Sequence, residues 1–257
     1  MNNGHSYVVK YKDMVLKAHP LRAEEVPEIF DFMSAVKFND ENYKTLLGIG
    51  CESQFRKKGA LVETSESMLW DAVKHPERYT SMGIWNEDET PESFIIAENE
   101  DFEEMISKNN LFFKEGFEDK WDELYSTKMN HTLMYKGDMR VNPKSKVGKC
   151  FFIMFYLFLK DAIDKGFRFG ASEVFDIIGY CENDIWHDID VYNERSFRAQ
   201  IKGVKAAYIA DGSVKEKEIG KDIKIKYYSK ILRYDFLASY KYIEKGIKFL
   251  NLTITEE

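Results

Sequence analysis

Apolar and polar residues alternate along several short stretches of the chain, the pattern of β-strands with one buried face. Between the second and third stretches, residues 86–91 form an acidic segment with a proline, which predicts a hairpin turn. The last two stretches flank a polar region at 212–222 that we also expect to be a turn. The expected strands cover residues 14–21, 80–85, 93–97, 132–141, 169–180, 206–210 and 224–234.

Other stretches carry apolar residues three and four positions apart, which predicts amphipathic helices. The helix that follows residue 148 has an almost wholly apolar beginning and ends before Gly166, a residue suited to a C-cap. Residues 101–128 are rich in acids and aromatics, and we expect an inserted helical excursion that forms either a lid or an outer packing layer. The expected helices cover residues 22–33, 66–74, 148–165, 192–204 and 236–250.

The order strand, helix, strand over residues 132–180 predicts two parallel strands that are neighbours in one sheet. The expected hairpins at residues 80–97 and 206–234 add antiparallel strands. Together these elements predict an α/β (α+β) fold with a mixed sheet.

Composition narrows the class of protein. The 257 residues are 44% apolar and 32% charged, which is typical of a globular chain. A net charge of −7 argues against a general nucleic-acid binder. The longest apolar run, at 150–159, is too short to span a bilayer, and the N-terminus lacks the order of a secretory signal.

The cysteines and the acidic cluster at 181–190 do not predict a metal site. Cys51, Cys150 and Cys181 are widely separated and lack zinc-like spacing, so we interpret them as reduced thiols of a cytoplasmic protein. The cluster at 181–190 lacks the glycine and the spacing of a calcium loop, and we expect a loop that leads into a helix.

Residues 143–149 form a basic loop with three lysines and no acid, and they lead into the start of a helix. The first N–H groups of a helix lack intrahelical partners and favour an anion, and Gly148 would let the backbone approach it. An ordinary solvated basic loop is the alternative. A P-loop is excluded because Pro143 and Cys150 occupy two of its required positions, and the dinucleotide fingerprint is absent.

The segment Val141-Asn142-Pro143, followed by residues 145–150 (SKVGKC), resembles the acyl-CoA pyrophosphate loop of the GNAT superfamily of N-acyltransferases. That motif is V-x-P and then [RQ]-x-x-G-x-[GA]; Ser145 stands at the Arg or Gln position and Cys150 at the last one. A second resemblance is Asn193, which opens a helix that ends in a Lys-Gly-Val turn at 202–204. The resemblance covers about residues 14–234.

The resemblance implies a single GNAT-like domain over residues 1–257, with a helical insertion at about 100–128 and an extra C-terminal helix at about 236–250. It implies a mixed, mostly antiparallel central sheet with a splayed parallel strand pair and helices on both faces. It also implies that residues 38–76 cover the acceptor pocket.

The implied activity is that of an acetyl-CoA-dependent N-acetyltransferase, in which a primary amine attacks the thioester directly. A non-catalytic acyl-CoA-binding or regulatory module on the same fold is the alternative. Backbone N–H groups around 139–141 would polarise the thioester carbonyl, and the loop would bind the pyrophosphate. The cofactor-binding residues implied are Met139, Arg140, Val141, Lys146, Val147, Gly148, Lys149, Cys150 and Asn193.

The proton-transfer groups are less constrained. Glu173 is the candidate general base, with Asp176 and Asp138 as further strand carboxylates, although such side chains often face solvent. The tyrosine that many family members use as general acid would fall near Gln200, where it is missing. Tyr192 and Ser196 are candidate substitutes, as is Tyr208; otherwise the thiolate departs without an enzyme acid, or activity has been lost.

The implied partners are a small-molecule or protein amine acceptor and a possible second copy in a homodimer. No nucleic acid, no membrane and no metal are expected.

Overall fold

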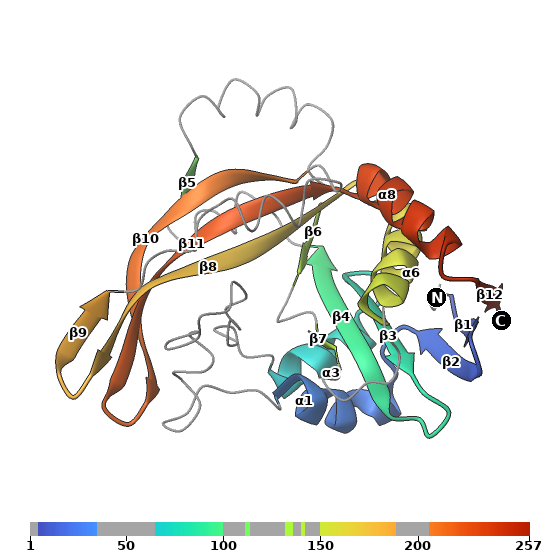
Figure 1. Cartoon of the computed structure of the whole chain (residues 1–257), viewed down its shortest axis with the longest axis horizontal. Coiled ribbons are helices and arrows are strands. Elements are labelled where there is room, and N and C mark those ends of the chain that lie inside the picture. Colours follow the sequence, from blue (N-terminus) through green and yellow to red (C-terminus); the bar gives the residue numbers. More distant parts are fainter. Residues whose placement is uncertain are drawn as a thin grey trace.

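The computed structural model describes residues 5–34, 65–99, 111–113, 132–135, 140–141, 150–188 and 206–257, and every statement below concerns these residues. They form a 12-stranded sheet flanked by helices (Figure 1). Along the sheet the strand order is β12-β1-β2-β3-β4-β6-β8-β11-β10-β5, and β7 and β9 pair with β4 and β8. The strands are β1 (Tyr7–Tyr11), β2 (Met14–His19), β3 (Tyr79–Trp85), β4 (Pro91–Asn99), β5 (Leu111–Phe113), β6 (Thr132–Tyr135), β7 (Arg140–Val141), β8 (Phe169–Glu182), β9 (Ile185–Asp188), β10 (Ala206–Gly220), β11 (Ile223–Asp235) and β12 (Leu252–Glu256).

The sheet is mixed and mostly antiparallel, as expected. Among the described strands, β6 and β8 form the one parallel pair, with Thr132 opposite Phe169 and Met134 opposite Ala171. This pairing confirms the strand, helix, strand prediction, because α6 (Cys150–Asp164) crosses between the two strands.

Helices cover both faces of the sheet, which confirms that part of the prediction (Figure 1). The short 3-10 helix η1 (Ala23–Glu25) leads into α1 (Val26–Ser34), which lies with α3 (Glu66–Lys74) on one face. α6 and α8 (Phe236–Lys248) lie on the other. Successive side chains of β3 and β4 point to opposite faces of the sheet, so each strand contributes to both cores. Trp85 and Phe94 pack under α1 and α3, whereas Ile84 and Ile95 pack under α6.

The predicted helix ends are also present. Gly166 has a φ of 89°, and Phe167 N–H donates to the carbonyl of Ala162 at 2.9 Å, which closes the C-terminus of α6. At the start of α8, the carboxylate of Asp235 accepts from the Ala238 N–H at 2.9 Å. The expected helix at 192–204 lies outside the described residues.

Two predicted turn regions are strands instead. β10 continues through residues 212–220 to a turn at Lys221 and Asp222. A strand can carry so many charged residues there because this end of the sheet is open to solvent. β8 and β9 form a hairpin around Asn183 and Asp184, whose φ angles of 49° and 63° suit a two-residue turn. The expectation of a loop and helix entry at 181–190 was therefore wrong for 181–188.

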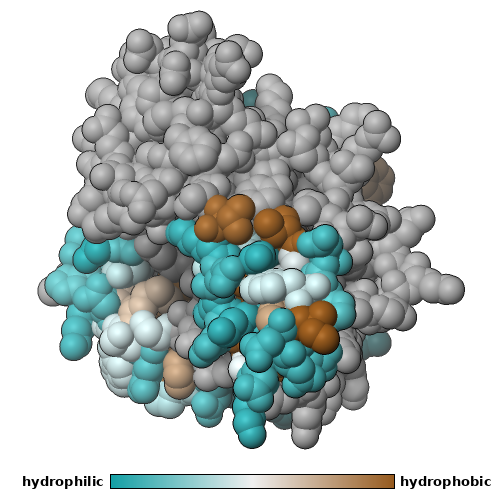
Figure 2. Space-filling model, turned by 90° about the vertical axis from the view of Figure 1, so that its left-hand side faces the viewer, coloured by the Kyte–Doolittle hydropathy of each residue, from teal (hydrophilic) through white to brown (hydrophobic). Residues whose placement is uncertain are grey.

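These hairpin ends form a largely polar end of the sheet. Figure 2 looks onto this end and shows hydrophobic atoms set among hydrophilic ones. Ile185 and Val214 are exposed there, and the ammonium of Lys226 lies 3.9 Å from the ring centroid of Trp186.

Within the expected helical insertion at 101–128, Leu111–Phe113 is a short strand, β5, that pairs with β10. The remainder of that segment lies outside the described residues. β1 and β12 were not predicted. They pair with each other antiparallel at the end of the sheet, which places the two ends of the described chain side by side (Figure 1).

Candidate functional site

The parallel strands β6 and β8 are paired over only a short stretch. β6 pairs with β8 from Thr132 to Met134, and β8 beyond Ala171 continues with β11. β4, in contrast, holds both β6 and β7 on the same edge, with Ala97 opposite Tyr135 and Ser93 opposite Val141. The described residues therefore include no ladder between β7 and β8. This is the splayed strand pair that the resemblance implied.

The register of β4 also changes between β6 and β7. On β4, Ile95 and Ile96 separate the two paired stretches, whereas residues 136–139 separate them on the other side. Two extra residues are thus inserted opposite β4 where the parallel pair separates.

The N-terminus of α6 lies beside β7. The hydroxyl of Ser93 and the thiol of Cys150 are 3.0 Å apart, and Ser93 is opposite Val141 in the sheet. Both side chains are buried, so this contact fixes where the helix begins. The first turn of α6 itself has no acidic residue, although the buried carboxylate of Glu92 on β4 lies close enough to act on Cys150.

Burial raises the pKa of the Cys150 thiol to about 12, against a smaller lowering by the hydrogen bond with Ser93. The thiol is therefore neutral at physiological pH. A buried neutral thiol is a poor nucleophile, and in this structure Cys150 packs at the start of α6.

Most sequence-predicted site residues lie outside the described residues and stay predictions. The backbone of Arg140 and Val141 forms β7, Cys150 opens α6, and Glu173 lies on β8 two positions beyond Ala171, opposite Ile231. Glu173 is thus past the last row shared with β6. Outside the described residues are Met139, Lys146, Val147, Gly148, Lys149, Tyr192, Asn193 and Ser196.

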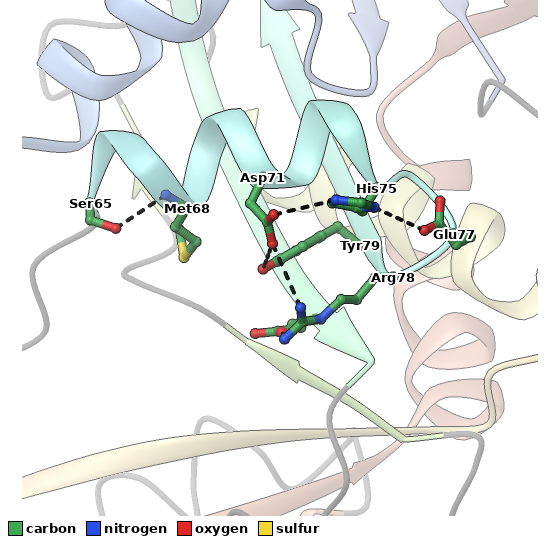
Figure 3. A network of polar contacts seen from close by, with 8 residues as sticks. Ser65, Met68, Asp71, His75, Glu77, Arg78 and Tyr79 are labelled. Atoms are coloured by element: carbon green, nitrogen blue, oxygen red, sulfur yellow. Dashed lines mark hydrogen bonds and ion pairs between the residues drawn. The ribbon is translucent and has the colours of Figure 1, made fainter.

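A polar cluster that we did not predict lies at the same row of the sheet (Figure 3). Glu98 on β4 is opposite Tyr79 on one side and Met134 on the other, and Met134 is the last residue of β6 paired with β8. The side chain of Glu98 is buried and forms an ion pair with Arg78. A buried carboxylate therefore sits in the row where the parallel pair opens.

Helix α3 supports this cluster from one face of the sheet. Tyr79 donates its hydroxyl proton to Asp71 at 2.9 Å, and Arg78 lies 3.8 Å from the same carboxylate oxygen. His75, one turn after Asp71, lies 3.7 Å from the other oxygen. Burial and the hydrogen bond to Asp71 raise the pKa of Tyr79, so its hydroxyl stays protonated.

The sequence carried one signal for Glu98. It is an acid within an otherwise apolar strand (SFIIAEN) and shares its side with Phe94 and Ile96, the buried residues under α1 and α3. A carboxylate on a buried face requires a partner or a function. Its partner, Arg78, lies in the turn just before β3 and could not be identified by spacing alone.

Within the described residues, no group of three or more His, Cys, Asp or Glu side chains could hold a metal ion. Likewise, none of the described helices combines the length and the hydrophobicity needed to cross a bilayer.

No protein-family model and no curated protein match this chain. Solved structures do match. The GNAT domain of S. lividans PAT is 9% identical, with coverage of 90% of this chain and 96% of that chain and a TM-score of 0.43. PaiA N-acetyltransferase of Thermoplasma acidophilum, solved with coenzyme A, is 13% identical, with coverage of 82% and 97% and a TM-score of 0.39.

The ribosomal-protein-S18-alanine N-acetyltransferase of Escherichia coli is 9% identical, with coverage of 86% of this chain and 94% of that chain and a TM-score of 0.44. At these scores the likeness concerns the general arrangement of strands and helices, and we transfer no residue role from it. The strand order and the short parallel pair of this chain by themselves show a mixed, mostly antiparallel sheet, as the sequence predicted.

Proposed function

We propose that this protein is an acetyl-CoA-dependent N-acetyltransferase that transfers an acyl group to a primary amine. One observation carries the proposal: among the described residues β8 pairs with β6 but not with β7, and the start of α6, whose own first turn has no acidic residue, lies beside β7. A strand with free backbone groups next to a helix N-terminus suits a ligand with a diphosphate at one end and an amide-rich arm at the other.

Acetyl-CoA is the co-substrate of this chemistry and supplies the thioester. In our proposal the N–H groups before and within the first turn of α6 bind its diphosphate, and Lys146 and Lys149 add positive charge. The backbone of residues 139–141 donates to the thioester oxygen, which becomes more negative as the amine attacks. Asn193 would contribute from the helix expected at 192–204.

The amine nitrogen forms a bond to the carbonyl carbon, the C–S bond breaks, and the CoA thiolate leaves. A neutral Cys150 thiol supports direct attack by the amine over an acyl-cysteine intermediate at this position. The amine must lose a proton on the way, and a carboxylate near the opening would accept it.

Two carboxylates are candidates for this step. Glu173 lies on β8 just past the last paired row, and Glu98 lies in that row on β4. Glu98 is buried and oriented by Arg78, which would hold it in place while a water molecule connects it to the amine. Tyr192 and Ser196 remain candidates to protonate the leaving thiolate.

Calorimetric titration with CoA tests the cofactor part of this proposal. Gly148→Leu should weaken CoA binding by about tenfold or more, because a side chain would hold the diphosphate away from the backbone. Gly246→Leu is the matched control, since nothing lies within 4 Å of a Cβ added there. Equal CoA affinity in both variants and the unmodified protein would refute the loop as the binding site.

A non-catalytic acyl-CoA-binding module is the second candidate. It is favoured by Ser145 in place of the family Arg or Gln and by the missing tyrosine near Gln200. An acyl-transfer assay over small polyamines, amino acids, aminoglycosides and protein amines separates the two, because CoA binding without turnover on any of them supports the module.

A further inference from the structure

The last strand, β12, lies at the end of the sheet. It pairs antiparallel with β1, from Leu252 opposite Tyr11 to Glu256 opposite Tyr7. In the part of the chain that the structure describes, no other strand pairs with it. Among the residues that the structure describes, one edge of β12 is therefore unpaired and open to a further strand.

The hydrogen-bond pattern shows which backbone groups lie on that edge. Glu257 N–H donates to the Ser6 carbonyl at 2.9 Å, so Glu257 and Ser6 are a hydrogen-bonded pair. Pairs of this kind alternate along an antiparallel ladder, so Thr253 and Thr255 also bond to β1. The N–H and C=O groups of the intervening residues point away from it. These residues are Leu252, Ile254 and Glu256.

The β1–β2 hairpin supports this assignment independently. Tyr11 and Met14 flank a two-residue turn and are therefore a hydrogen-bonded pair. Tyr11, Val9 and Tyr7 then bond to β2, which leaves Val8 and Lys10 to bond to β12.

The side chains of β12 hold the strand in place without protecting its edge. Leu252 and Ile254 pack against the core under α6 and α8. Lys160 of α6 donates to Glu256 at 2.9 Å and to the Tyr7 hydroxyl at 3.2 Å. Thr253 and Thr255 are exposed on the opposite side. The strand contains no proline and no lysine, the residues that commonly prevent edge pairing.

We propose that β12 pairs with β12 of a second copy of this chain, antiparallel, about a two-fold axis at Ile254. This inference does not depend on the proposed function. In this register Ile254 faces its own copy, Leu252 faces Glu256, and Thr253 faces Thr255. All of the outward N–H and C=O groups then meet outward groups of the partner.

The sequence favours a second copy as the occupant. It reads Thr-Ile-Thr in both directions about Ile254, so the two-fold axis places a threonine opposite a threonine on each side. Such pairs suit a cross-strand position. Phe249, the C-cap residue of α8 shortly before β12, is 86% exposed. The contact is short, so the dimer should be weak.

A charge arrangement at the two threonines tests the register. Thr253→Glu with Thr255→Glu places two acids opposite each other twice in the dimer, which is repulsive. Thr253→Glu with Thr255→Lys places an acid opposite a base twice, which is attractive. Within one chain, position 253 faces Lys10 in both variants, and both threonines are exposed, so the two variants should fold alike.

Sedimentation velocity over protein concentrations from about 1 µM to about 1 mM is the measurement. We expect the unmodified protein and the Glu/Lys variant to dimerise, and the Glu/Glu variant to have a dimer Kd higher by about tenfold or more. Monomers throughout for the unmodified protein would overturn the proposal. Equal dimerisation of both variants would overturn it too, because the dimer would then use another surface.

Hydrogen exchange gives a second readout on the unmodified protein. The amides of Leu252, Ile254 and Glu256 should become more protected as concentration rises, whereas those of Thr253 and Thr255 are already bonded to β1. Exchange at Ile254 that does not change with concentration in a dimerising sample would contradict the proposed pairing.

Discussion

The imidazole of His19 lies flat against the indole of Trp85, with ring centroids 3.9 Å apart and planes 7° from parallel. The two residues come from adjacent strands, and His19 is directly opposite Gly83 in the sheet. The indole of Trp85 lies back over Gly83, where a Cβ would collide with the ring. A glycine is therefore required for this stacking, for a steric reason and not for its backbone angles.

Gly83→Ala should lower the free energy of unfolding by about 1–3 kcal/mol, because the new methyl group displaces the Trp85 ring from a fully packed site. Urea denaturation followed by tryptophan fluorescence measures this change. Gly246→Ala is the matched control: its added Cβ meets nothing within 4 Å inside α8, so it should raise stability by about 0.5–1 kcal/mol. If the two substitutions changed the free energy of unfolding equally, the packing of Trp85 over Gly83 would not be what forbids a side chain at position 83.

The pair His19 and Glu25 predicts an unusual dependence of stability on pH. Nε2 of His19 and Oε1 of Glu25 are 3.5 Å apart, and both side chains are largely buried. Burial lowers the pKa of His19 to about 4 and raises the pKa of Glu25 to about 7. Below the usual histidine pKa of about 6.5, His19 is protonated in the unfolded chain but still neutral in the folded protein. His19 therefore lowers the free energy of unfolding as the pH drops from about 6.5 to 4.

Glu25 acts in the opposite direction. Folded Glu25 keeps its proton up to about pH 7, whereas the unfolded chain loses it near pH 4.5, so Glu25 makes stability fall as pH rises through this window. Glu25→Gln should therefore be more stable than the unmodified protein above pH 7 and should lose stability more steeply between pH 6.5 and 4. Denaturation at a series of pH values measures this, with exposed Glu24→Gln as control. Parallel profiles for the two variants would contradict the assignment.

Glu98 should matter for catalysis more than for CoA binding. If it accepts the amine proton through water, Glu98→Gln should lower kcat on the order of 10²-fold and leave the Kd for CoA unchanged. Asp71→Asn is the control, since it removes the other carboxylate beside Arg78 and keeps Glu98. Similar losses in the two variants would indicate a structural role for the whole cluster.

Cys150 should be dispensable for turnover. Its thiol pKa of about 12 leaves almost no thiolate at neutral pH, so Cys150→Ala should change kcat less than about tenfold while lowering stability by about 1 kcal/mol. Mass spectrometry of the unmodified protein with acetyl-CoA should find no acylated Cys150. Loss of turnover in Cys150→Ala together with normal turnover in Cys181→Ala would instead favour an acyl-cysteine route.

Local sequence signals predicted most of the regular elements. Helix α3 begins and ends where the pattern placed it, because Ser65 is a good N-cap and the apolar residues recur at helical spacing. The β3–β4 hairpin was equally clear, and Asn86 stabilises its turn by accepting from the N–H groups of Asp88 and Thr90. The far part of β10 was missed because charged residues on both sides of a solvent-exposed strand give no alternating pattern.

The sequence by itself determined the order of most strands and helices, the parallel crossover through α6 and the absence of acid in its first turn, since each depends on residues close together in the chain. Three contacts could be known only from the tertiary structure: the ion pair of Glu98 with Arg78, the contact of Ser93 with Cys150, and the pairing of β12 with β1. These contacts join residues 20 or more positions apart, and the sheet that brings them together is selected by burial of its two faces as a whole.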